Sequence, residues 1–152
     1  MEEVYARRNI DIAQATDRLK KAAGELGLRW GERKNTYNSR RAQELGKWAE
    51  TKGKGNEFHN AVFRAYFVDG KNISQPEVLA SLAKTVGLSK KEAEKALQMR
   101  AFKDAVDADW ALAYKMGITA VPTFVLDRQA VVGAQPYTVL EQFLLKNGVE
   151  RK

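Results

Sequence analysis

The sequence predicts a mainly helical α/β chain in which the helices come first and a β-hairpin with one helix comes last. Two observations carry this prediction. Apolar residues recur at helical spacing over most of residues 12–116. The period then changes at "TFVL" (123–126), which is β-branched and apolar without polar alternation, as in a strand buried on both faces.

Six helices are expected before the hairpin, and their ends carry recognisable signals. Asn35 or Thr36 can cap the second helix, and Ser74 and Ser89 each precede a Glu by three residues, the capping-box spacing. The segment "KGKGN" (52–56) is a flexible break, and Gly87 stops a helix. The expected helices span about 12–26, 37–51, 57–68, 75–86, 90–98 and 100–115.

The hairpin consists of strands 123–126 and 130–134, and "DRQ" turns the chain between them. Pro136 suits the first turn of a last helix, about 137–147. Pro122 stands at the mouth of the first strand, although proline cannot donate to a sheet ladder. A trans proline that begins an edge strand and a cis proline in a demanding turn both fit this local sequence.

The composition excludes several kinds of chemistry. The 152 residues contain no cysteine, which rules out disulfides, thiol nucleophiles, Cys-based zinc sites and thiol redox chemistry by these residues alone. No apolar run is long enough for a membrane span, and "MEEVYARRNIDIAQ" has no apolar core of a secretory signal. We therefore expect a cytoplasmic protein without membrane partners.

Charge alone does not indicate nucleic-acid binding. The net charge is +7, and the paired basic residues at 7–8, 33–34 and 40–41 could form a phosphate-binding face. The alternative is that they solvate helix surfaces. No nucleic-acid motif and no basic run of five residues accompanies them.

Other candidate sites carry weak signals. His59 is the only histidine, and with neither a second histidine nor a cysteine it predicts neither a metal site nor a catalytic triad. Asp104 and Asp107 share a helix face, but a solvated surface explains them. The aromatic helix 57–68 is expected to face the core, with a ligand-binding wall as the alternative. No cofactor motif is present.

The segments "GITAVPTFVLD" (117–127) and "AVVGAQPYTVLEQFL" (130–144) resemble the C-terminal end of DsbA-family thioredoxin-like proteins, nearest to the FrnE-like branch. "VPTF" and "GAQP" carry most of this resemblance, and Ala120 replaces the usual glycine. Upstream, "NTYNSRRAQELGKWAE" and "FRAYFVDGKNIS" are similar to the helical insertion of the same branch. The implied fold is an incomplete α/β thioredoxin-like one, a single truncated domain with a helical part over 12–116 and the cis-proline loop, hairpin and final helix over 117–148.

The resemblance implies a cis Val121–Pro122 bond and substrate contacts at Val121, Pro122 and Thr123, where an extended peptide or a thiol-protein substrate would pair with the backbone. The Cys-x-x-Cys unit of the family is absent, so we expect the chain alone to be inactive in thiol–disulfide exchange. A truncated oxidoreductase and a natural relative without redox chemistry both fit.

Two further functions stay open. One is a non-catalytic module that binds a peptide or a small ligand. The other, ranked lower, is a relative of the glutathione-dependent 2-hydroxychromene-2-carboxylate isomerases. Because a two-stranded hairpin is marginal alone and "TFVL" is apolar throughout, we also expect a homodimer.

Overall fold

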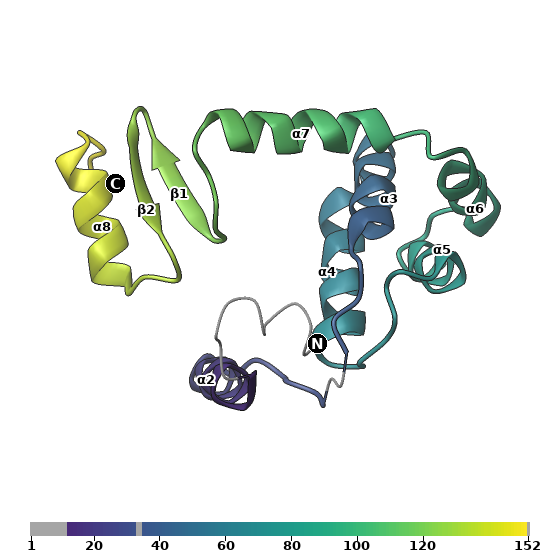
Figure 1. The fold of residues 1–152 in the computed structure, drawn as a ribbon, viewed down its shortest axis with the longest axis horizontal. Helices are drawn as coiled ribbons and strands as arrows, with labels where there is room; N and C mark the ends of the chain where they lie inside the picture. Colours follow the sequence, from purple (N-terminus) through teal and green to yellow (C-terminus); the bar gives the residue numbers. More distant parts are fainter. Residues whose placement is uncertain (1–11, 33–34, 152) are drawn as a thin grey trace. The chain divides into compact units, whose positions relative to one another are not determined.

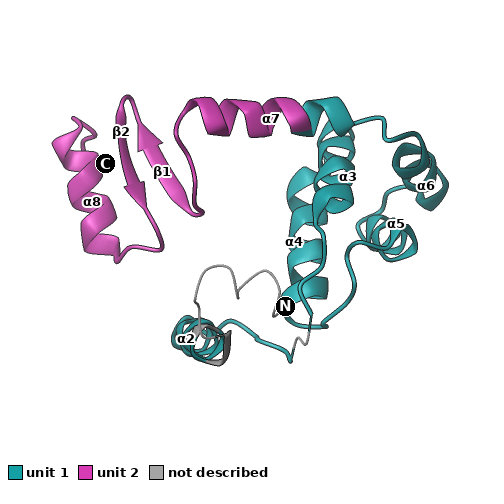
Figure 2. Cartoon of the chain, in the orientation of Figure 1, with its two compact units in different colours: residues 1–106 teal, residues 107–152 magenta. Residues whose placement is uncertain are grey.

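A computed structural model describes residues 12–32 and 35–151. The chain divides into two compact units, residues 1–106 and 107–152, coloured separately in Figure 2. The boundary falls within one helix, α7 (Lys103–Lys115). The expectation of a single truncated domain stays a prediction.

The first unit consists of helices, as Figure 1 shows. The expected helices are all present, and their ends differ from the predicted ones by at most three residues. They are α2 (Ile12–Glu25), α3 (Arg40–Thr51), α4 (Gly55–Phe67), α5 (Pro76–Thr85), α6 (Lys90–Met99) and the first turn of α7.

Two of the predicted caps are wrong and one is confirmed. Helix α3 starts later than expected, with Ser39 as its N-cap residue, so neither Asn35 nor Thr36 is the cap. The Asn38 side-chain oxygen accepts from the Arg40 amide at 2.8 Å. Ser74 does not cap α5, because its hydroxyl donates to Asn72 at 2.6 Å and Gln75 precedes Pro76 as the N-cap. The Ser89 hydroxyl does accept from the Glu92 amide, at 3.3 Å.

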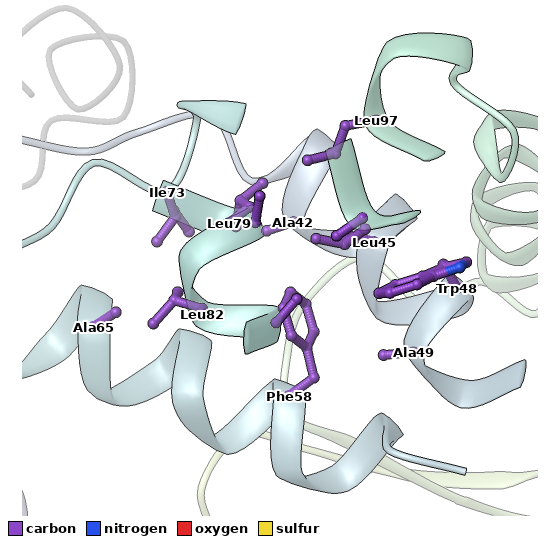
Figure 3. Packing of buried hydrophobic residues seen from close by; sticks show 13 residues of the cluster. Ala42, Leu45, Trp48, Ala49, Phe58, Ala65, Ile73, Leu79, Leu82 and Leu97 are labelled. Atoms are coloured by element: carbon purple, nitrogen blue, oxygen red, sulfur yellow. The ribbon is translucent and has the colours of Figure 1, made fainter. Parts of the chain in front are cut away.

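The core of the first unit lies among α3, α4, α5 and α6, with Phe58, Leu45 and Leu79 almost completely buried (Figure 3). Alanines at many of the contacts let the helices approach closely, because they add little volume between two backbones. The buried cluster is Ala42, Leu45, Trp48, Ala49, Phe58, Ala65, Ile73, Leu79, Ala80, Leu82, Ala83, Ala93 and Leu97.

The aromatic helix α4 faces the core only in part. Phe58 is buried, as predicted, but Phe63 is 57% exposed. Among the described side chains of α2, Ala23 is buried whereas Leu19 is exposed, and Leu26, directly after the helix, is exposed as well. Helical periodicity therefore located these helices correctly, but it did not predict which of their apolar side chains are buried against another helix.

The second unit carries the hairpin of β1 (Thr123–Leu126) and β2 (Gln129–Val132), followed by α8 (Tyr137–Lys146). The strands are antiparallel, with Thr123 opposite Val132 and Leu126 opposite Gln129. Strand β2 ends before Gly133, whose φ of +90° suits glycine and turns the chain toward α8.

The prediction that "TFVL" is buried on both faces is wrong for this chain. Phe124 and Val125 are 41% and 39% exposed. Strand β1 pairs with a single strand in the described part of the chain, and none of the α8 residues is fully buried. Two strands and one helix are too few to cover both faces of a strand. The rest of the second unit is also rich in exposed apolar side chains, which include Trp110, Leu112, Tyr114, Met116, Val132, Tyr137, Leu144 and Leu145.

Candidate functional site

Of the three residues predicted to contact substrate, Val121 and Pro122 lie in the loop between α7 and β1, and Thr123 is the first residue of β1. The Val121–Pro122 peptide bond is cis, the isomer that the family resemblance implies. Val121 is 89% exposed. The loop begins at Gly117, whose φ of +71° ends α7 while its amide donates to the Tyr114 carbonyl at 2.9 Å.

Hydrogen bonds on either side hold this loop, and they do not involve the backbone of Val121. The Thr123 hydroxyl donates to the Ala120 carbonyl at 2.6 Å, and the Pro122 carbonyl accepts from the Gly133 amide at 2.8 Å. Within the described part of the chain, no group hydrogen-bonds the amide or the carbonyl of Val121. The Val121 backbone is therefore open to an extended partner at the entry to β1.

Gln135 has a supporting role that sequence reasoning did not assign. Its side-chain amide donates to the Val132 carbonyl at 2.8 Å. This bond ties the turn after β2 to the end of the strand opposite Thr123. The side-chain bond thus fixes the "GAQP" turn next to the Val121 loop.

The first unit contains a separate apolar pocket of about 360 Å³ between α3, α4 and the segment before α3. Tyr66 packs edge-on against Tyr37 and Phe67, with ring centroids 6.4 and 4.8 Å apart. The aromatic side of α4 that the core does not bury thus forms a wall of this pocket, and the ligand-binding role that the sequence left as an alternative stays a prediction. The lining residues are Thr36, Tyr37, Ser39, Ala42, Gln43, His59, Val62, Phe63, Tyr66, Phe67 and Ile73.

His59 lies at this pocket. Its Nε2 is 3.6 Å from a carboxylate oxygen of Glu50, and its ring packs against Gly46 of α3. No group of three potential metal ligands occurs among the residues that the structure describes. The Asp104 side chain is fully exposed, 3.7 Å from the Lys103 ammonium, so the expected solvated surface is confirmed there.

Among the described residues one carboxylate is buried, and it holds α3 to the residue after α6. Glu44 is 3% exposed and accepts from Arg40 at 2.8 Å and from two nitrogens of Arg100 at 2.6 Å. The hydrogen bonds from Arg100, with those from Arg40, hold the pKa of Glu44 below its ordinary value even though burial opposes ionisation. Arg40 also donates to the Lys103 carbonyl at 2.9 Å, which attaches the start of α7 to the same network.

No helix among the described residues is long and apolar enough to cross a membrane.

The DSBA-like thioredoxin domain model matches residues 6–145, so the chain belongs to that family. The helices, the hairpin and the final helix are accordingly parts of a DsbA-like thioredoxin fold. In the described part of this chain, the sheet of that fold consists of two strands.

Three known proteins are similar to this chain. The crystal structure of the probable DsbA oxidoreductase SCO1869 from Streptomyces coelicolor has a TM-score of 0.83 and 31% identity, covering 99% of this chain and 68% of that one. The uncharacterized protein YwbO of Bacillus subtilis is 34% identical over 96 residues, 62% of this chain. That match spans 48% of YwbO, about half its length. The structure of a 2-hydroxychromene-2-carboxylate isomerase has a TM-score of 0.77 and 20% sequence identity. The match covers 90% of this chain and 66% of that one, and it shows that the two share a fold.

Proposed function

We propose that this chain is a FrnE-like member of the DsbA-like family that binds an extended polypeptide along the backbone at Val121 and Pro122. The observation that carries the proposal is the exposed Val121, whose amide and carbonyl have no hydrogen-bond partner among the described residues. An extended peptide could pair with this backbone as an added strand. Thr123 and Gln135 support the loop from either side.

The proposed role does not include thiol–disulfide exchange by these 152 residues. That reaction needs a thiolate to attack a disulfide, and the sequence has no cysteine. A thiol-protein substrate held at Val121 would need its chemistry from another molecule. We propose the cytoplasm as the compartment.

A pair of variants tests the peptide proposal. Binding of reduced and alkylated insulin B chain, an extended polypeptide without free thiols, is followed by NMR of the isotopically labelled protein. We expect shifts centred on residues 119–124. Val121→Pro, which removes the amide donor, should abolish them, whereas Val121→Ala keeps the backbone donor and should bind normally. Equal binding by both variants, or shifts elsewhere in the chain, would refute recognition through this backbone.

A small-ligand function is the second candidate, favoured by the aromatic pocket of the first unit. Its lining combines the Tyr37, Phe63 and Tyr66 rings with hydrogen-bonding groups on Gln43 and His59. Such a mixture is typical of pockets that bind small molecules. Phe63→Ala should weaken binding of a small aromatic probe without changing the insulin B chain titration; loss of both would point to a folding defect in place of a ligand site.

A further inference from the structure

A second pocket in the first unit is lined by arginines. It has a volume of about 300 Å³ and is lined by Asn38, Arg40, Arg41, Ser74 and Arg100. Three of these five side chains carry a permanent positive charge, and none of the five is acidic. The pair Arg40–Arg41 is one of the basic pairs in the sequence; the pairs at 7–8 and 33–34 lie outside the described residues.

The buried carboxylate of Glu44 fixes two of these arginines in position. Arg40 and Arg100 both donate to it, and the Arg40 side chain is only 17% exposed. A single carboxylate thus orients two guanidinium groups, and each guanidinium has five N–H groups. The two arginine side chains are therefore already ordered in the folded protein, so a ligand that binds them does not lose that conformational entropy on binding.

Arg41 adds a third guanidinium, which forms no ion pair with any of the described residues. It is exposed and lies at the beginning of α3, where the positive end of the helix dipole also favours an anion. Asn38, whose oxygen accepts from the Arg40 amide, adds a side-chain amide that can donate.

The surrounding acids restrict the size of the ligand. Glu77 and Glu94 line an adjoining pocket that also contacts Arg41 and Arg100. A long polyanion such as a nucleic acid would meet these carboxylates, whereas a single oxyanion group would not have to. We infer that the arginine pocket formed by Arg40, Arg41 and Arg100 binds the phosphate group of a small molecule, because arginine forks match phosphate oxygens.

The test uses the full chain at constant ionic strength, with chloride as the balancing ion. Inorganic phosphate and glycerol 3-phosphate are titrated separately and followed by NMR of the labelled protein. We expect saturable shifts at residues 38–41 and 100. Tighter binding of glycerol 3-phosphate would identify a phosphate monoester as the ligand, and tighter binding of inorganic phosphate would identify the free ion.

Arg41→Gln should raise the dissociation constant at least about tenfold, as expected for losing hydrogen bonds to a charged group. Arg64→Gln is the matched control, because it removes the same charge from an exposed position on α4 outside this pocket, and it should bind as the unmodified chain does. Shifts that do not saturate, or an equal loss of affinity in both variants, would overturn the proposal. Such a result would mean that phosphate acts only through general charge screening.

Discussion

Arg100 donates from Nε and Nη2 to the two carboxylate oxygens of Glu44, 2.6 Å from each. These residues are 56 positions apart, and Arg100 reaches Glu44 from the residue after α6, where its φ is +51°. Arg40 completes the arrangement from the first position of α3. The network therefore joins α3 to the residue after α6 around one buried charge.

Glu44→Gln should destabilise the first unit by about 3 kcal/mol, because it removes one partner of a buried ion network and leaves two guanidinium groups without their carboxylate. Chemical denaturation followed by tryptophan fluorescence measures the loss. Glu77→Gln, an exposed position in α5, is the control and should change stability by less than about 0.5 kcal/mol. Equal stability of the two variants would mean that the network contributes nothing net.

The same network predicts a pH dependence. The pKa of Glu44 is lower in the folded chain than its ordinary value of 4.5. Its contribution is therefore fully present above pH 4.5 and is lost as the pH falls through the lower folded pKa. Denaturation midpoints measured between pH 7 and pH 3 should fall more steeply for the unmodified chain than for Glu44→Gln. Parallel curves would contradict the assigned charge on Glu44.

Gly31→Ala should also destabilise the first unit. The Gly31 amide donates to the Phe67 carbonyl at 2.9 Å, and a Cβ at this position would collide with the Val68 carbonyl oxygen. Because the obstacle is backbone, we expect a cost of about 1–3 kcal/mol. Gly24→Ala is the control: a Cβ there meets nothing, so alanine should stabilise α2 slightly. Thermal unfolding of both variants checks the opposite signs.

The isolated chain should not catalyse thiol–disulfide exchange. With no cysteine, it can form no mixed disulfide with a substrate. Insulin reduction by dithiothreitol, monitored by turbidity, should proceed at the rate without protein. Acceleration above that rate would require chemistry that does not use a protein thiol.

We expect the chain to form a homodimer in solution. Phe124, Val125 and Val132 are exposed on a two-stranded sheet, an arrangement that tends to pair with another chain. Light scattering after size exclusion at micromolar concentration should give about twice the 17.1 kDa of one chain. Val125→Lys should shift the mass toward the monomer, and Lys115→Ala, an exposed change outside the hairpin, should not. A concentration-independent mass near 17.1 kDa would refute the dimer.

Local sequence determined the order and approximate limits of the elements. The apolar spacing located the ends of the helices within three residues, and the apolar run "TFVL" coincides with β1. Both patterns could be read because they depend only on residues that are neighbours along the chain. The Ser89 cap was readable for the same reason, since its partner Glu92 is three residues away. The "VPTF" and "GAQP" motifs correctly indicated the family. Family membership can be recognised from the order of residues in such motifs without knowledge of the packing.

Tertiary structure decided burial and pairing. The sequence placed no importance on Glu44, yet its partner Arg100 lies 56 residues away and only the packing of α3 against α6 brings them together. Periodicity likewise could not show that Phe58 is buried while Phe63 remains exposed on the same helix, or that Phe124 lacks a covering neighbour. Burial depends on which other element occupies the space beside a residue, and that is fixed by contacts between segments distant in the sequence.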